Sequence, residues 1–190
     1  MQLLKDKIIQ EGRVLSDSIL KVDSFLNHQL DIELLNEIGK EFKLRFENQK
    51  ITKILTAEVS GIAIAAIAAQ YFNVPVVFAK KIESKSLDKE TYEGSVYSYT
   101  KDKHYKIRVA KRFLSEGDKI LIIDDFLANG QAILGLKEIV DSAKANLVGV
   151  GIVIEKGFQE GGSLLRSSGM NIESLAIVDT LEQGNIVFRY

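Results

Sequence analysis

Two adjacent carboxylates, Asp124 and Asp125, follow an apolar run rich in β-branched residues and precede a short turn. The turn contains Asn129 and Gly130, and the segment after it has the apolar spacing of an amphipathic helix. Carboxylates at the carboxyl end of a buried strand can accept hydrogen bonds from vicinal hydroxyl groups. The free N–H groups of a turn and the positive end of the next helix favour a phosphate group. This order of residue types therefore predicts a sugar-phosphate site.

A structural interpretation of the same residues stays open. Asp125 would then cap the following helix or form the turn, and Asn129-Gly130 is a common pair in tight turns. An Asp-Asp pair by itself is weak evidence for function. Two like charges at a strand end repel each other, however, and this repulsion favours a cationic or polyhydroxyl partner.

Two other predicted strands end in polar turns, and parallel α/β sheets bind ligands at the carboxyl ends of their strands. Ser60 and Gly61, in the turn of residues 58–61, can offer N–H groups to a phosphate, or they form an ordinary βα turn. Lys156 can donate to a carbonyl oxygen and Phe158 can stack on a flat ring. The alternatives for these two residues are a surface ion and an aromatic ring at the edge of the core.

The composition is that of an ordinary globular protein. The chain has 190 residues, of which 46% are apolar and 27% charged, and this length suits one α/β domain over residues 1–190. A net charge of −1 gives no general attraction for nucleic acid or for an anionic membrane. There is no cysteine, and the two histidines lie far apart, so no metal-ligating residues are predicted. The N-terminus lacks the apolar core of a signal peptide, so we expect a cytoplasmic protein.

Strand and helix patterns alternate along most of the chain, and the short apolar strands lack the alternation of a half-exposed sheet. Strands buried on both faces are typical of parallel sheets with crossover helices, so the pattern predicts an α/β fold with a mostly parallel sheet. The predicted strands cover residues 51–57, 74–79, 119–124, 147–154 and 173–178, and the last of these is expected to close the sheet.

The predicted helices have apolar stripes that would face the core. Asp31 is expected to cap a helix over residues 32–46. Residues 15–30 are predicted as short turns and caps. In a helix over residues 1–14, one side would carry Leu3, Leu4, Ile8 and Ile9. The other predicted helices cover residues 62–72, 131–145 and 162–168, and the first of these is apolar nearly all round, which predicts that it is buried.

Residues 80–113 break this alternation. Residues 80–94 are polar and aperiodic, whereas residues 95–100 and 105–113 predict two strands of an exposed antiparallel hairpin. A polar insertion of this length is often a lid over an active site. A solvated excursion without a function is the alternative.

The segment of residues 120–132, ILIIDDFLANGQA, resembles the phosphoribosyl-pyrophosphate signature of the type I phosphoribosyltransferases. The resemblance extends to residues 14–17, 20–29 and 151–159, which are similar to the xanthine-specific branch of this family, and it covers nearly the whole chain. It implies the type I phosphoribosyltransferase fold, with a mostly parallel sheet flanked by helices, an N-terminal hood and a flexible hairpin lid. Residues 1–35 would contribute to the hood and residues 80–113 would form the lid.

The resemblance also implies roles for residues in the sugar-diphosphate site. Asp124 and Asp125 would hold the ribose 2- and 3-hydroxyls and act in catalysis. The 5-phosphate and the pyrophosphate would be bound by two loops, with two lysines near the pyrophosphate: Ala128, Asn129, Gly130, Gln131 and Ala132; Glu58, Val59, Ser60 and Gly61; Lys80 and Lys81. Mg²⁺ would enter with the phosphoribosyl pyrophosphate, and the family usually forms homodimers.

Three residues are implied to bind the purine. Leu20 and Asn27 would do so from the hood, and Lys156 from the end of a strand. The hairpin residues that are candidates to reach the site are Tyr97, Ser98 and Tyr99.

The chain departs from the family pattern at three positions of the phosphate turn. Many members have threonine where this chain has Asn129 and Ala132, so the backbone here would do more of the phosphate binding. Hypoxanthine–guanine enzymes carry an aspartate at the position of Ala128, near the purine imidazole. Without that carboxylate, the base would bind already deprotonated, or would lose its proton to water or to pyrophosphate.

The implied reaction is purine salvage, in which phosphoribose passes from 5-phosphoribosyl 1-pyrophosphate to xanthine. Two alternatives remain. One is a transferase that prefers guanine or adenine. The other is a non-catalytic regulator that senses phosphoribosyl pyrophosphate, although such repressors add an N-terminal DNA-binding module and this sequence starts directly at the hood with no basic helix pair.

Overall fold

A six-stranded sheet forms the centre of the protein in a computed structural model that describes residues 1–81, 90–98 and 102–189. The strand order is β10-β9-β8-β7-β3-β4, and all neighbours pair in parallel except β10 and β9, which are antiparallel. The prediction of a mostly parallel sheet is confirmed, but β10 and not residues 173–178 forms the last strand. The strands are β3 (Lys53–Ala57), β4 (Val76–Ala79), β7 (Lys119–Leu127), β8 (Asn146–Lys156), β9 (Ile172–Thr180) and β10 (Val187–Phe188).

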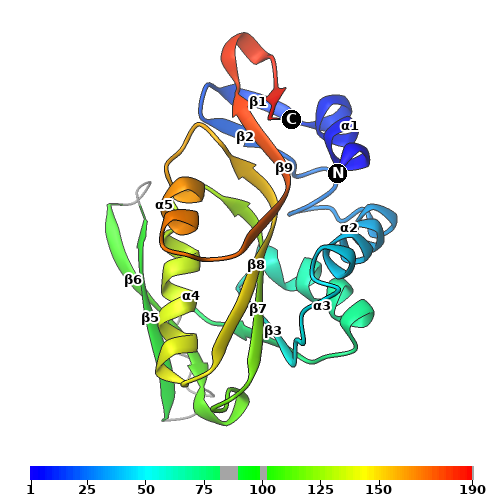
Figure 1. Cartoon of the computed structure of the whole chain (residues 1–190). Helices are drawn as coiled ribbons and strands as arrows, with labels where there is room; N and C mark the ends of the chain where they lie inside the picture. The colour runs from blue at the N-terminus through cyan, green and yellow to red at the C-terminus, as the bar shows by residue number, and fades with distance from the viewer. Residues whose placement is uncertain (82–89, 99–101, 190) are drawn as a thin grey trace.

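Both faces of this sheet are covered (Figure 1). Helices α2 (Ile32–Arg45) and α3 (Ser60–Phe72) pack on one face, and α4 (Gln131–Ser142) and α5 (Gly161–Ser167) pack on the other. Along β7, Leu121 and Ile123 belong to the first core, whereas Ile120 and Ile122 belong to the second. Because successive side chains point to opposite faces, both sets must be apolar, which explains why the sequence shows no alternation.

Local sequence signals placed α2 correctly. Asp31 is its N-cap, and the Asp31 carboxylate accepts a hydrogen bond of 3.0 Å from the Leu34 N–H. The predicted stripe of Leu34, Leu35, Ile38 and Phe42 is buried.

Two predictions about helix faces were wrong. In α1 (Gln2–Glu11), Leu4 and Ile8 are buried, but Leu3 and Ile9 are 50% and 60% exposed. With 3.6 residues per turn, these two lie on opposite flanks of the buried pair. In α3 the face that includes Ala66 is exposed, because α2 and the sheet cover only the opposite face.

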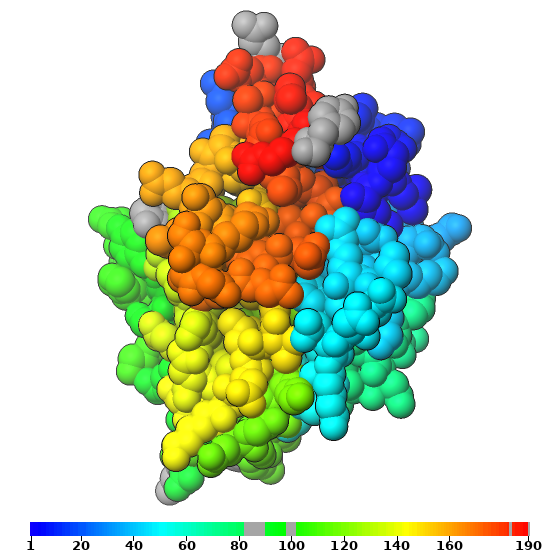
Figure 2. Space-filling model, in the orientation of Figure 1, coloured from blue at the N-terminus to red at the C-terminus, as the bar shows by residue number. Residues whose placement is uncertain are grey.

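The N-terminal region contains a hairpin that the sequence did not reveal. Strands β1 (Arg13–Ser16) and β2 (Ile19–Lys21) pair antiparallel. They cover the end of the helix predicted over residues 1–14, since α1 ends at Glu11, and the first part of the segment predicted as short turns. The Met1 amino group donates to the Leu175 carbonyl at 2.6 Å, which ties the chain start to β9. Figure 2 shows the N-terminal (blue) and C-terminal (red) segments side by side at one end of the molecule.

A second hairpin, β5 (Thr91–Ser98) and β6 (Lys103–Ala110), confirms that the insertion contains an antiparallel pair. Both strands begin earlier than the predicted residues 95 and 105, and β5 includes residues 91–94, which were predicted to be aperiodic. It is not simply exposed, however, because its inner face packs on α4 and buries Val96, Ile107 and Val109. The contact depends on two glycines: a methyl group on Gly94 would lie 2.0 Å from the carbonyl oxygen of Gly135 in α4.

Two 3₁₀ helices, Lys111–Phe113 and Glu182–Gly184, complete the described elements. Within the described ranges, no helix has the length and apolarity needed to span a membrane.

The glycine contact gives a test of how the hairpin is anchored. In an ordinary strand, Gly→Ala stabilises the fold by restricting the unfolded chain. Gly94→Ala should instead lower the free energy of unfolding by about 1–3 kcal/mol, because the methyl group overlaps the α4 backbone. Urea unfolding measures this, with Lys103→Ala at the exposed end of β6 as the control. A Gly94→Ala protein as stable as wild type would show that the hairpin packs loosely.

Candidate active site

The acidic pair lies inside a strand and not at its end. Strand β7 continues to Leu127, so the prediction that it ends at Asp124 was wrong. The reason is its partner, since β8 is long enough to pair with Phe126 and Leu127 beyond the two acids. The phosphate turn therefore begins only at Ala128, and Asp124 is 8% exposed.

The two acids have different neighbours. Asp125 accepts a hydrogen bond of 3.2 Å from the Asn27 amide, which comes from the N-terminal region. Asp124 lies beside Gly61 of α3, where its Oδ1 would be 3.0 Å from an added methyl group. Each carboxylate also accepts the N–H of the next residue, at 3.0 Å for Asp124 and 2.9 Å for Asp125. Gly130 is the N-cap of α4, so the interpretation of Asp125 as its cap was wrong.

The surroundings of Asp124 oppose its ionisation. Burial raises the pKa of Asp124 well above its ordinary value, and the negative charge of Asp125 raises it further. The positive charge of Lys81 acts in the opposite direction. A ligand that donates hydrogen bonds or brings positive charge would therefore favour the ionised carboxylate.

The turn of residues 128–132 is held open at the start of α4. Gly130 has a φ of 79°, in the left-handed region that favours glycine. From the far side, Gly161 at the start of α5 donates its N–H to the Ala128 carbonyl at 3.1 Å. This close approach requires a glycine, because a methyl group on residue 161 would lie 2.2 Å from the same oxygen. The backbone N–H groups at the start of α4 suit a phosphate.

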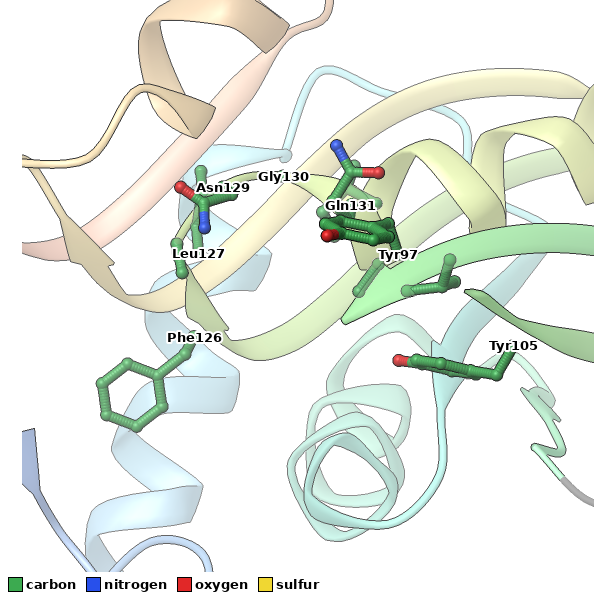
Figure 3. Close-up of a pocket in the computed structure, with 11 residues that line it drawn as sticks. Tyr97, Tyr105, Phe126, Leu127, Asn129, Gly130 and Gln131 are labelled. Carbon is green, nitrogen blue, oxygen red and sulfur yellow. The ribbon is translucent and has the colours of Figure 1, made fainter. Parts of the chain in front are cut away.

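A pocket of about 230 Å³ opens over this turn (Figure 3). Phe126 lies on one side of it, and Tyr97 and Tyr105 of the second hairpin lie on the other. The pocket is lined by Val96, Tyr97, Tyr105, Phe126, Leu127, Ala128, Asn129, Gly130, Gln131, Ala132 and Ile133.

The hairpin candidates have different outcomes. Tyr97 lines the pocket as expected, and its hydroxyl donates to Asp102. Ser98 is the last residue of β5, and Tyr99 lies outside the described residues. Tyr105 was not anticipated from the sequence, although its place in an alternating strand was a signal that it shares a face with inward-pointing residues.

The loop of residues 58–61 lies close to the acidic pair and joins β3 to α3. Its Glu58–Val59 peptide is cis, and the Glu58 carboxylate accepts a hydrogen bond of 2.6 Å from the Lys81 N–H. Helix α3 begins at Ser60, two residues before the predicted start at residue 62.

Lys80 and Lys81 diverge. The Lys81 ammonium lies 5.5 Å from the centre of the Tyr105 ring, on the side of the pocket. The Lys80 ammonium lies 5.9 Å from the ring of Phe78, which belongs to the outer strand β4. Adjacent residues of an extended chain point in opposite directions, so only Lys81 is brought toward Tyr105 and Asp124.

The three predicted purine-binding residues come from distant parts of the chain. Leu20 of β2 is buried, and Asn27 reaches Asp125. The Lys156 ammonium donates to the Ser18 carbonyl at 2.9 Å and lies 5.8 Å from the centre of the Phe126 ring. Burial lowers the pKa of Lys156.

The aromatic ring beside Lys156 is that of Phe126. From the sequence, Phe158 was predicted as the aromatic residue that stacks on a flat ring. Phe158 is partly buried against the core that includes the N-terminal residues. The signal for Phe126 was its place directly after the acidic pair, two residues before the phosphate turn.

Comparisons with known proteins show what this chain is similar to. The family described as "Phosphoribosyl transferase domain" matches residues 22–164. The chain is 69% identical over 189 residues to a xanthine phosphoribosyltransferase of Alkaliphilus metalliredigens (strain QYMF), covering 100% of this chain and 94% of the relative. It is 59% identical over 190 residues to a xanthine phosphoribosyltransferase of Clostridioides difficile (strain 630), with 100% of both proteins covered.

Solved structures share the fold at low identity. An adenine phosphoribosyltransferase from Trypanosoma brucei, in complex with AMP, pyrophosphate and ribose-5-phosphate, superposes with a TM-score of 0.77 at 21% identity and covers 92% of this chain and 78% of its own. The adenine phosphoribosyltransferase from Rhodothermus marinus has a TM-score of 0.74 at 20% identity, with coverage of 94% and 100%. The likeness extends to the fold alone.

The buried carboxylate predicts a pH-dependent cost in stability. Because the pKa of Asp124 is raised in the folded protein, its contribution to stability is present at low pH and is lost as the pH rises through that raised value. Asp124→Asn does not ionise, so its free energy of unfolding should increase relative to wild type between pH 4 and pH 8. Urea unfolding across this range measures the difference, and Asp141→Asn, an exposed carboxylate of α4, is the control. A difference that does not change with pH would contradict the burial argument.

Proposed function

The chain belongs to the phosphoribosyltransferase family, and we propose that it transfers phosphoribose from 5-phosphoribosyl 1-pyrophosphate to xanthine. The products are xanthosine 5'-monophosphate and pyrophosphate, which makes the protein a purine salvage enzyme. The observation that carries this proposal is the high identity, along the whole chain, to relatives named xanthine phosphoribosyltransferase. The geometry of the site supports it independently.

The acidic pair and the two loops would bind the sugar diphosphate. Asp124 and Asp125 would accept hydrogen bonds from the ribose hydroxyls, and residues 128–132 would hold the 5-phosphate at the start of α4. Residues 58–61 would bind the pyrophosphate, with Lys81 beside them. The contact between Glu58 and the Lys81 N–H supports this grouping, because it joins the loop to the lysine.

In the reaction, pyrophosphate leaves the anomeric carbon while positive charge builds up on the ribose ring. The two carboxylates would stabilise this charge, because a backbone N–H holds each of them in place and Asp124 is buried from solvent. Tyr97 and Tyr105 would help to exclude water that otherwise hydrolyses the sugar. Ala128 carries no carboxylate, so xanthine would enter as an anion or would lose its proton to water or pyrophosphate.

Magnesium would be carried by the diphosphate. Among the described residues, no group of three or more His, Cys, Asp or Glu side chains could hold a metal ion. The carboxylate oxygens of Asp124 and Asp125 are ligands of the kind that suits Mg²⁺ carried by a diphosphate. When bound, Mg²⁺ neutralises the charge of the leaving group.

The purine would bind between the N-terminal region, acting as a hood, and the end of β8. Lys156 would donate to the 6-oxo group of xanthine and the Asn27 amide to the 2-oxo group, while Leu20 packs on the ring. Phe126 lies close enough to Lys156 to present its ring to the base. A pocket with a donor for the 2-oxo group rejects hypoxanthine, which lacks that oxygen.

Two further features are carried over from the family. The protein would act as a homodimer in the cytoplasm, with the second hairpin as its lid. The exposed face of α3 and the 39% exposed Phe78 on the outer strand β4 offer apolar surface for a second subunit.

A substrate panel tests the proposed function. With phosphoribosyl pyrophosphate and Mg²⁺, the protein should release pyrophosphate rapidly with xanthine, more slowly with guanine and negligibly with adenine. Pyrophosphate release is measured by a coupled assay with one base at a time, and a reaction without any base is the control. Equal rates for the three bases would refute the specificity, and no turnover with any base would favour a regulator that only senses the sugar diphosphate.

Lys156→Met tests the purine site separately from the sugar site. Methionine keeps the length of the side chain but cannot donate to the 6-oxo group. We expect kcat/KM for xanthine to fall by about 10- to 100-fold, since a hydrogen bond to a charged donor is lost, while KM for phosphoribosyl pyrophosphate changes little. The matched control is Lys137→Met on the exposed side of α4. A parallel rise in both KM values would mean that Lys156 supports the whole site and not the purine pocket.

A further inference from the structure

Thr56 is a polar residue in the centre of the protein for which the fold has no evident use. It lies on β3, one residue before the strand ends, and is 0% exposed. Within the part of the chain that the structure describes, its hydroxyl has no hydrogen-bond partner. Buried hydroxyl groups are nearly always paired, so an unpaired one calls for an explanation.

The hydroxyl lies directly behind the loop of residues 58–61 and close to the acidic pair. A methyl group built on Gly61 would lie 2.0 Å from the Thr56 Oγ1 and 3.0 Å from the Asp124 Oδ1. Both oxygens therefore lie close to one point, the position that a β-carbon of residue 61 would occupy. Glycine at this position lets the hydroxyl and the carboxylate approach each other without a side chain between them.

Folding alone favours a different residue at position 56. Valine has nearly the same shape as threonine and an equal preference for strands, and it would place a methyl group where the hydroxyl now lies unpaired. The unpaired hydroxyl therefore lowers the stability of the fold. A hydrogen bond that forms when a ligand binds would compensate for this loss.

Asp124 is the neighbour that can supply this gain. In the ligand-free protein its Oδ1 accepts the Asp125 N–H. The ionised form of Asp124 is the one that accepts hydrogen bonds from the sugar hydroxyls. An ionised carboxylate that is buried from water is stabilised most by an additional hydrogen-bond donor. The hydrogen of the Thr56 hydroxyl can rotate about the Cβ–Oγ1 bond, so the group is a donor within the same small space.

We propose that Thr56 is a positioning residue whose hydroxyl donates a hydrogen bond to the Asp124 carboxylate when the ribose of phosphoribosyl pyrophosphate binds. The bond orients the carboxylate toward the ribose hydroxyls and holds it ionised through the reaction. This inference rests on the proposed function, because it assigns Thr56 to the sugar-diphosphate half of the site.

The test compares two variants that separate the hydroxyl from the methyl group. Thr56→Val keeps the shape and removes the donor, so kcat/KM for phosphoribosyl pyrophosphate should fall about tenfold or more while the urea midpoint stays at or above that of wild type. Thr56→Ser keeps the donor and removes the methyl group. It should recover most of the turnover with a lower urea midpoint. KM for xanthine should change little in either variant.

A purely structural role makes activity follow stability, so the serine variant would then be the less active of the two. That order, or a valine variant with the kinetics of wild type, would overturn the proposal.

Binding of phosphoribosyl pyrophosphate with Mg²⁺, measured by calorimetry without any base, gives a second test. The affinity should fall only in the valine variant. If wild type binds the sugar diphosphate but turns over no purine, the proposed function fails, and this binding comparison still decides the role of Thr56.

Discussion

The structure depends on burying a carboxylate in the middle of a parallel sheet. Asp124 lies on β7 between β3 and β8, where both faces of the sheet are covered and solvent is largely absent. Such a group destabilises the folded chain when it is ionised, as the raised pKa of Asp124 reflects. Gly61 of the loop of residues 58–61 lies against this carboxylate, and the charges of Asp125 and Lys81 shift its pKa in opposite directions.

Several parts of the site are positioned by contacts to backbone atoms. The start of α5 supports the phosphate turn through the bond from Gly161 to Ala128. The second hairpin reaches the pocket because Gly94 and Gly135 let β5 lie against α4. The N-terminal region is joined to the sheet by the bond from Lys156 to the Ser18 carbonyl. Small residues and backbone atoms carry these contacts, so the loops can be close-packed and still leave a pocket open.

Sequence reasoning succeeded where a local rule governs the structure. The cap at Asp31, the two-faced apolar strands and the alternating hairpin all follow from interactions within a few residues, and all were confirmed. It failed where a distant partner decides the outcome. Strand β7 runs past Asp124 because β8 pairs with it there, and α3 stays exposed on one side because α2 and the sheet cover its other side. Strands β1 and β2 have too few residues to show a periodic pattern.

The sequence by itself determined the fold class and the family, and it predicted the chemical nature of the site. These properties reside in the order of residue types along residues 120–132 and in the apolar pattern of the strands, both of which are local. Only the tertiary structure decided which side chains meet. It separated Lys80 from Lys81, replaced Phe158 by Phe126, and put Thr56 behind Gly61 and Asp124. The physical reason is that burial and side-chain direction depend on how neighbouring strands and helices pack, and residues far apart in the sequence set that packing.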